Sequence, residues 1–183
     1  LVAGFKRPNL AFSVVPVKSV EDKLTHLRKM LKEPGPAIIY TSTRKAVEEI
    51  GHELGCFAYH AGMDREVRTR VHNAFMQDDN PVLAATNAFG MGIDRKDVRR
   101  VIHYNMPGSL EAYYQEAGRA GRDNRDADCI VLYSWRDRHI QEFLIDMSNP
   151  SPETIRQVYT SLLEQARVTG TATVELTQAE LKE

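Results

Sequence analysis

The stretch FAYHAGMDREVRTRVHNAFMQDDNPVLAAT, residues 57–86, contains the alternation of strand and helix that decides the fold. Its two ends, Phe57–Tyr59 and Val82–Thr86, are short apolar runs of the kind found in buried strands. Between them, apolar residues recur at helical spacing after Asp64, a favourable helix cap. These residues are Val67, Val71, Ala74 and Phe75. The stretch is therefore predicted to form a strand, a helix and a second strand.

The same alternation continues in both directions along the chain. Further apolar, β-branched runs occupy residues 12–17, 37–41, 101–104 and 129–133. Leucines at helical spacing also follow a Ser19-x-x-Asp22 cap. Because the strands are continuously apolar, we expect them to be buried on both faces of a parallel sheet. The predicted fold is α/β, a doubly wound parallel sheet with helices on both faces and ligands at the carboxyl ends of the strands.

The pattern changes near residue 134, so we predict a main lobe at residues 1–134 and a short helical C-terminal extension at residues 135–183. One amphipathic stretch of the extension carries Ile140, Phe143, Leu144 and Met147. Ser151 and Pro152 are a good cap and first turn for a second helix, with apolar residues on one side. After Gly170 we expect a short strand and the start of a further helix, capped by Thr177.

The composition is that of an ordinary soluble globular protein, with 42% hydrophobic and 27% charged residues. No apolar run approaches the roughly 18 residues that cross a bilayer, so we expect an intracellular protein that does not bind membranes. Cys56 and Cys129 stand alone, which predicts two buried thiols and no metal site. The net charge is −1, but basic residues cluster at positions 95–100 and 119–125. Such clustering favours a phosphate-binding function only modestly.

The segment Tyr113-Tyr-Gln-Glu-Ala-Gly-Arg-Ala-Gly-Arg-Asp123 is the most informative for chemistry. It begins as a helix, and Gly118 is expected to end that helix with a positive φ. Arg119 and Arg122 then alternate with glycines. Arginine offers a planar fork of donors that is always charged, which suits a phosphate that gains charge during phosphoryl transfer. The alternative is a plain glycine turn with two surface arginines.

Four segments, in the same order along the chain, resemble conserved motifs of superfamily 2 helicases. Their residue sequences are similar to those of the RecQ family of ATP-dependent DNA helicases. Gln115-x-x-Gly118-Arg119-x-Gly121-Arg122 resembles the last conserved motif of that superfamily. The other three are residues 38–44, residues 59–63 and residues 84–94, and the start at Arg7-Pro-Asn-Leu is also similar. The resemblance covers about residues 5–135 and implies the second of two RecA-like motor lobes.

The resemblance implies a shared ATP site, to which this lobe contributes one side. Arg122 would be the arginine finger that reaches the γ-phosphate, and Arg119 would support it. Asp94 would accept a hydrogen bond from the ribose, while Gly90 and Gly92 would let the backbone approach the nucleotide. On local evidence, an ordinary turn is the better explanation of those glycines. Gln115 and Gly118 complete the expected nucleotide-binding set.

The resemblance also implies single-stranded DNA, and duplex junctions, as partners gripped through phosphates. The residues in matching places are Ser42, Arg44, His60, Thr86 and Asn87. Hydroxyl, amide and backbone N–H groups hold phosphate without reading sequence, which suits a motor that moves along any strand. His60 alone would more often be structural. Helicases of this family move along DNA in the 3′ to 5′ direction and take part in recombination and repair. The resemblance therefore implies a location in the cytoplasm of a bacterium or the nucleus of a eukaryote.

The sequence lacks a G-x-x-x-x-G-K-[ST] phosphate loop and an Asp-Glu magnesium motif. ATP and Mg²⁺ would therefore be held mainly by a first lobe from elsewhere in a longer protein, and this chain alone is predicted to be inactive. Many bacterial relatives carry a four-cysteine zinc module after this lobe. No cysteine follows Cys129, so either that module is absent or its ligands lie past Glu183. The helix expected after Pro152 and the segment after Gly170 resemble a zinc-free lead into a winged-helix region.

Two other functions remain open at this point. A DEAD-box RNA helicase lobe shares the Gly-Arg-x-Gly-Arg ending but typically has His-Arg where this chain has Gln115 and Glu116. A non-catalytic nucleic-acid-binding module would share the fold without needing a correctly placed arginine pair. Both arginines are present, which favours the motor lobe.

Overall fold

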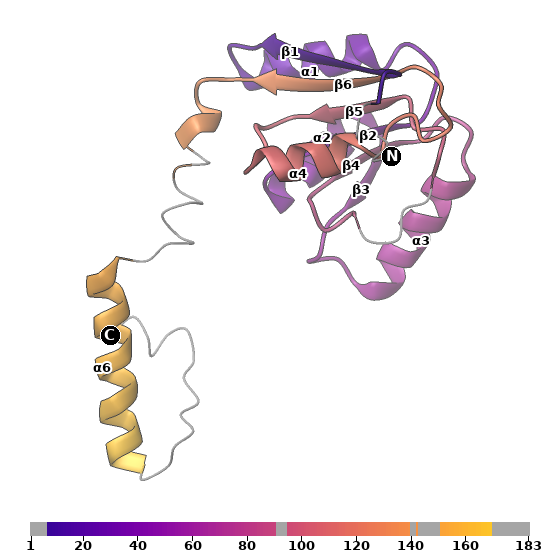
Figure 1. Cartoon of the computed structure of the whole chain (residues 1–183). Coiled ribbons are helices and arrows are strands. Elements are labelled where there is room, and N and C mark those ends of the chain that lie inside the picture. The colour runs from indigo at the N-terminus through magenta and orange to yellow at the C-terminus, as the bar shows by residue number, and fades with distance from the viewer. Residues whose placement is uncertain (1–6, 91–94, 140–141, 143–150, 170–183) are drawn as a thin grey trace, which may run out of the picture. The chain divides into compact units, whose positions relative to one another are not determined.

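A computed structural model describes residues 7–90, 95–139, 142 and 151–169. Six parallel strands form one sheet in the order β1-β6-β5-β2-β4-β3 (Figure 1). The strands are β1 (Leu10–Pro16), β2 (Ala37–Tyr40), β3 (Phe57–Tyr59), β4 (Val82–Ala85), β5 (Arg100–His103) and β6 (Ala127–Tyr133). The predicted parallel α/β sheet is confirmed, and each expected apolar run forms a strand within two residues of its predicted bounds.

In the described part of this lobe, four labelled helices lie between strands: α1 (Val20–Met30), α2 (Arg44–Leu54), α3 (Arg65–Gln77) and α4 (Leu110–Ala117). Ser19 caps α1 by accepting a hydrogen bond from Asp22 N, as its sequence predicts. Ser109 caps α4 in the same way. Asp64 precedes α3 without a side-chain cap bond. Local capping chemistry thus sets where most of these helices begin.

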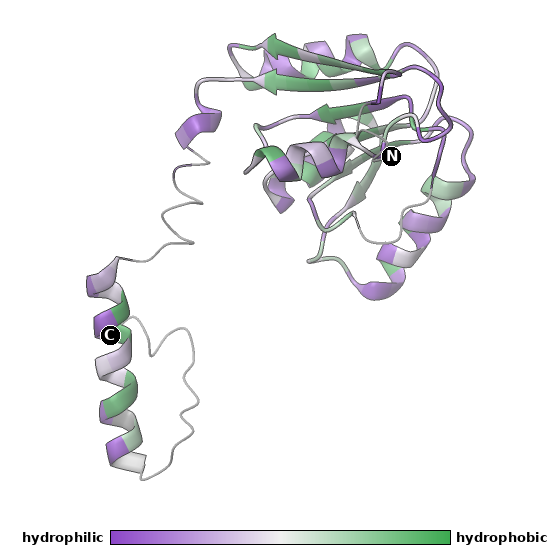
Figure 2. Ribbon diagram, in the orientation of Figure 1, coloured by the Kyte–Doolittle hydropathy of each residue, from purple (hydrophilic) through white to green (hydrophobic). Residues whose placement is uncertain are grey.

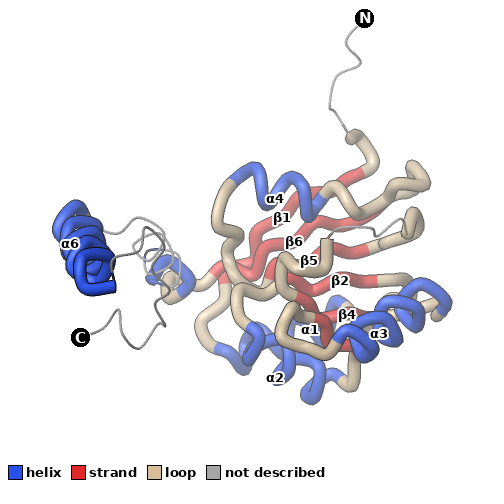
Figure 3. The backbone as a smooth tube through the Cα atoms, turned by 90° about the horizontal axis from the view of Figure 1, so that it is seen from below, coloured by secondary structure: helices blue, strands red, loops and turns tan. Residues whose placement is uncertain are grey.

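The sheet separates two hydrophobic cores. On one face α1 and α2 pack through residues such as Leu27 and Val47, which are fully buried. On the other face α3 and α4 pack through Phe75 and Ala117, together with Phe89 from the loop after β4. Figure 3 shows the strands side by side among these helices. The predicted cover of helices on both faces is confirmed.

The expectation that every strand is buried on both faces is wrong for β1 and β3. Phe12 and Val14 of β1 are 51% and 65% exposed, and all three residues of β3 are half-buried. Both strands lie at the edges of the sheet, whereas β2 and β5 lie inside it and are buried throughout. Apolar composition predicted the strands correctly but carries no information about which of them form the edges.

The chain divides into two compact units, residues 1–138 and residues 139–183. The second unit contains α6 (Pro152–Thr169), whose start is capped by Ser151, the residue predicted to do so. Figure 2 shows one hydrophobic side on α6. Three large residues of this helix, Ile155, Tyr159 and Leu163, are exposed. The predicted amphipathic stretch around Phe143 and the segment after Gly170 lie outside the described residues. No helix in the described ranges is both long and apolar enough to cross a bilayer.

Candidate functional site

The two candidate arginines lie in the arginine loop, defined here as residues 118–123, between α4 and β6. Gly118 ends α4 with φ −63°, so the prediction that this glycine adopts a positive φ is wrong. The left-handed residue is Gly121, with φ 54°. Gly118 continues the helical geometry for one more residue, and the chain turns three residues later.

Gly121 is also the point where other groups approach the loop backbone most closely. A Cβ atom there would lie 2.5 Å from Asn9 Nδ2 and 2.7 Å from the carbonyl oxygen of Arg125. Both distances are shorter than real Cβ contacts allow. Glycine is therefore required at this position by its backbone angle and by its neighbours together.

Gly121→Ala should lower the free energy of unfolding more than Gly55→Ala does. Gly55 has nearly the same angle, φ 61°, but open space around its Cβ position, so its alanine variant isolates the backbone strain of about 1 kcal/mol. The overlap at Gly121 should add about 1–3 kcal/mol. Denaturant unfolding of both variants measures the difference. Equal losses would show that the neighbours of Gly121 move aside freely.

Arg119 points into the lobe and is 7% exposed. Its guanidinium packs on Gly90, where a Cβ would lie 2.8 Å from Arg119 Nη2. The hydroxyl of Tyr40 donates to the carbonyl of Phe89 at 3.0 Å, just before that glycine. Burial raises the pKa of Tyr40, and the neighbouring Arg119 opposes that rise. The buried guanidinium of Arg119 thus links the arginine loop to the loop after β4.

A buried histidine supports α4 from beneath. His103 Nε2 lies 2.8 Å from Glu116 Oε2, and the His103 ring is 1% exposed on its side chain. The same ring stacks on Tyr40 at 5.6 Å and meets the edge of Tyr113 at 4.9 Å. This arrangement ties β5 and β2 to the helix that leads into the arginine loop. Sequence reasoning missed it, because nothing local marks His103 as a partner of Glu116.

Arg122 differs from Arg119 in being exposed. Its Nε donates to the carbonyl of Gly118 at 3.3 Å across the turn. Gln115, three residues before Gly118 on α4, is exposed as well. One arginine is therefore fixed inside the lobe, while the second is carried on the surface by a constrained turn. Gly92 and Asp94, the other residues expected at the nucleotide, lie outside the described residues.

The predicted DNA contacts gather at the carboxyl edge, defined here as the residues that directly follow β2, β3 and β4. These strands are neighbours, and their ends are aligned by hydrogen bonds from Thr41 N to Ala85 O and from Thr86 N to Tyr59 O. Ser42, His60, Thr86 and Asn87 therefore lie along one edge. Asn87 is exposed there, and Ser42 and Thr86 are half-buried.

The loop between β3 and α3 contacts α2 at two points, through Gly62 beside Arg44 and through His60 beside Glu48. A Cβ on Gly62 would lie 2.7 Å from Arg44 Nη1, so the exposed guanidinium rests on that glycine. His60 is 5% exposed, and its Nε2 lies 3.1 Å from Glu48 Oε1 of α2. The ring is thus enclosed, which matches the structural alternative for this histidine. Arg44 offers a cation beside the carboxyl edge.

A polar chain holds the Ser42 backbone in place from behind. Ser42 N donates to Asn105 Oδ1 at 3.2 Å, and Asn105 Nδ2 donates to Asp137 Oδ1 at 3.0 Å. Asp137 in turn pairs with Lys23 Nζ at 2.9 Å, and both side chains are nearly fully buried. None of these three supporting residues was predicted from sequence, since they come from separate elements and form no motif.

The basic cluster at residues 95–100 is mainly structural. Arg100 donates to the carbonyls of Met30, Glu33 and Pro34, which follow or end α1. Arg95 is buried, donates to Asp78 O at 2.8 Å and pairs with Asp97, whose pKa is lowered by that hydrogen bond. These cations satisfy carbonyls at loop and helix ends, so their clustering in the sequence does not mark a phosphate site.

The two cysteines are free thiols. Cys129 is fully buried in β6, and Cys56 is half-buried after α2. Burial raises the pKa of both thiols to about 11, so neither is an activated thiolate near neutral pH. The prediction of a buried thiol is confirmed for Cys129 and holds only in part for Cys56.

Comparison with known proteins gives this geometry a context. Residues 22–124 match the helicase conserved C-terminal domain. The chain is 39% identical over 162 residues to the Schizosaccharomyces pombe ATP-dependent DNA helicase hus2/rqh1, covering 84% of this chain and 12% of that protein. It is 39% identical over 151 residues to the Bacillus subtilis ATP-dependent DNA helicase RecQ, covering 79% of this chain and 25% of that protein.

A solved structure shows the same fold. The Escherichia coli DEAD-box protein SrmB, bound to regulator of ribonuclease activity A, superposes with a TM-score of 0.63 at 24% identity, covering 77% of this chain and 86% of that chain. This likeness supports the RecA-like architecture alone. The chain spans between an eighth and a quarter of the two curated relatives above, so most of each relative has no counterpart here.

Proposed function

Because the chain belongs to the helicase conserved C-terminal domain family, in its RecQ-like branch, we propose that it is the second motor lobe of an ATP-dependent DNA helicase that moves 3′ to 5′. In this role it supplies the arginine finger and one side of the sites for ATP and single-stranded DNA. The observation that carries the proposal is the contrast between a buried Arg119 and an exposed Arg122 on one constrained turn.

The arrangement suits a phosphate that arrives from outside the lobe. Arg119 cross-links the arginine loop to Gly90, so the loop stays rigid. Arg119 Nε is buried and has no hydrogen-bond partner among the described residues. Arg122 lies on the surface, where its fork could reach a γ-phosphate held by another lobe. Stabilisation of the transition state requires a guanidinium held in a fixed position, because most of the rate enhancement comes from positioning. A rigid loop with Arg122 exposed on its surface meets that requirement.

The residues present fit ATP as a shared substrate. ATP with Mg²⁺ supplies the phosphoryl group and its charge neutralisation, and the first lobe would hold most of both. This chain would contribute Arg122 and Arg119 at the phosphates, with Gln115 and the backbone at Gly90 and Gly118 nearby. Gly92 and Asp94 would complete its side of the nucleotide site.

We assign the carboxyl edge to single-stranded DNA, including strands at duplex junctions. Ser42, Thr86 and Asn87 offer hydroxyl and amide groups along one edge, and Arg44 adds a cation beside them. Such groups hold phosphates without reading bases. The enclosed His60 ring would tie the loop after β3 to α2, the helix that begins at Arg44, through Glu48. ATP-driven closure of this lobe on the first would move the strand by alternating grips.

The proposal predicts that ATP hydrolysis needs both lobes. A folded preparation of this chain should show no turnover, whereas the full-length protein should hydrolyse ATP faster when single-stranded DNA is added. Steady-state ATPase assays, with a cooperative melt to show that the isolated chain is folded, make the comparison. Turnover by the isolated chain would reveal a nucleotide site elsewhere and would overturn the half-site assignment.

The same assay separates the two rival functions. Stimulation by single-stranded RNA rather than DNA would favour an RNA helicase lobe of the DEAD-box kind. A full-length protein that binds single-stranded DNA without ATP hydrolysis would favour a non-catalytic binding module. The chain has Gln115 and Glu116 where DEAD-box proteins typically have His-Arg, and it is 39% identical to two DNA helicases. We therefore expect single-stranded DNA, rather than RNA, to stimulate ATP hydrolysis.

A further inference from the structure

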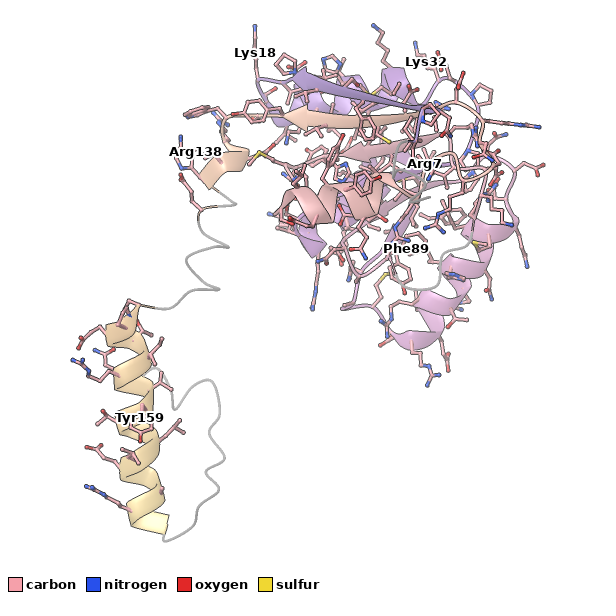
Figure 4. The ribbon with its side chains drawn as sticks, in the orientation of Figure 1. Arg7, Lys18, Lys32, Phe89, Arg138 and Tyr159 are labelled. Carbon is pink, nitrogen blue, oxygen red and sulfur yellow. The ribbon has the colours of Figure 1, made fainter. Side chains whose placement is uncertain are left out.

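The segment Arg7–Asn9, at the start of the described chain, lies against the arginine loop although more than 110 residues separate them in sequence. Arg7 Nη2 donates to Ala120 O at 2.9 Å and to Gly121 O at 2.7 Å. Asn9 Nδ2 donates to Gly121 O and to Arg125 O, each at 2.9 Å. Figure 4 shows Arg7 beside the amino-terminal ends of the strands.

This segment is itself fixed to the sheet. Ala127 N donates to Asn9 O at 3.0 Å, and the parallel pairing of β1 with β6 then begins at Leu10 and Ala127. Leu10 N donates back to Arg7 O at 3.1 Å, which closes a turn. Arg7 and Asn9 therefore act on the loop from a held position.

The contacts fall on the peptide group that carries Arg122. Gly121 O belongs to the peptide bond joining Gly121 to Arg122, and it accepts from both Arg7 and Asn9. Fixing that peptide plane fixes the direction in which the Arg122 side chain leaves the backbone. Bonds from a charged guanidinium are stronger than neutral ones, so Arg7 restrains the plane more firmly than an amide alone.

The opposite side of the loop is held by different residues. Gly121 N donates to Val98 O at 2.9 Å, Asp123 N donates to Lys96 O at 3.1 Å, and Arg99 pairs with Asp123 at 2.5 Å. The loop is thus held between the segment that leads into β1 and the segment that precedes β5. The missing side chain of Gly121 leaves room for the Asn9 amide, which would overlap any Cβ.

We propose that Arg7 and Asn9 are positioning residues that set the orientation of Arg122, and that the chain entering this lobe thereby controls the arginine loop. The inference rests on the proposed function, in which Arg122 completes the ATP site. A displacement of the entering segment would turn the peptide before Arg122. The position of this segment is consequently coupled to catalytic competence.

Arg7→Ala in the full-length protein should lower kcat for ATP hydrolysis by about ten- to a hundredfold, because a misplacement of about 1 Å can cost that much. The KM for ATP should stay near its wild-type value. Asn9→Ala should lower kcat less, and Arg7→Lys should recover part of the loss by reaching one carbonyl. Arg28→Ala, which removes an exposed arginine paired with Glu53 at 3.0 Å, should leave kcat unchanged and is the matched control.

Two further measurements separate this inference from the proposed function. If Arg7 acts through Arg122, adding Arg7→Ala to Arg122→Ala should cause no further loss of kcat. Hydrogen exchange of the full-length protein should also be faster over residues 118–123 in Arg7→Ala, since Gly121 N and Asp123 N lose protection. Unchanged exchange, or faster exchange with a wild-type kcat, would overturn the positioning role. Wild-type ATPase in Arg122→Ala would instead overturn the proposed function, and the exchange result would still stand.

Discussion

Replacing Arg122 with alanine in the full-length protein should reduce kcat for ATP hydrolysis by about 10³- to 10⁵-fold, the range that an arginine finger contributes. Nucleotide affinity should change little, because most of the contacts to ATP would lie on the first lobe. The exposed side chain donates from Nε to Gly118 O at a long 3.3 Å within its own turn, while Gly121 N and Asp123 N hold the loop through backbone hydrogen bonds that alanine at position 122 would retain. Steady-state ATPase and equilibrium nucleotide binding together measure both parts of the prediction.

Arg125→Ala provides the matched control for this prediction. Arg125 is exposed and only three residues away, and its loop contacts use backbone atoms that alanine retains. Its variant should therefore keep wild-type turnover. Arg122→Lys keeps the charge but loses the planar fork, so its kcat should fall between those of wild type and Arg122→Ala. Near-normal turnover in Arg122→Ala would exclude Arg122 as the finger.

Local sequence patterns predicted the strands and helices of this fold, because apolar runs and helix caps act through residues that are near one another in the sequence. Apolar runs marked all six strands, and the Ser19 and Ser151 caps form as the sequence indicates. The edge position of β1 could not be predicted, since it depends on which strand pairs with which. The same limit explains why Phe12 was expected to be buried.

The same limit applies to the candidate site: sequence patterns located the loop, but contacts between residues far apart in the sequence could not be predicted. The spacing of glycines and arginines singled out the arginine loop, but not that Arg119 is buried against Gly90 while Arg122 is exposed. That difference depends on contacts with the loop after β4. The supporting role of Arg7 was invisible for the same reason, because its partners are 113 and 114 residues away.

The buried pair Lys23–Asp137 is the other feature whose loss should have a large effect, here on stability. Lys23 and Asp137 side chains are 5% and 4% exposed, and their atoms approach to 2.9 Å. Lys23 Nζ also donates to Tyr104 O at 2.5 Å, and Asp137 accepts from Asn105 and from Ser134 N. The pair thus forms hydrogen bonds with the polar groups named above. Each partner also neutralises the charge of the other, which has little access to water.

Asp137→Ala should lower the free energy of unfolding by about 3–5 kcal/mol, because it leaves the Lys23 ammonium buried without a counter-charge. Lys23→Met should also destabilise, and the double variant should lose less than the sum of the single losses, because removing both charges leaves neither uncompensated. Lys45→Ala removes a cation 85% exposed on its side chain and 3.6 Å from Glu49, so it should cost only a few tenths of a kcal/mol, on the order of 0.3. Denaturant unfolding of all four variants measures these differences. Additive single losses no larger than that of Lys45→Ala would show that the pair contributes little to stability.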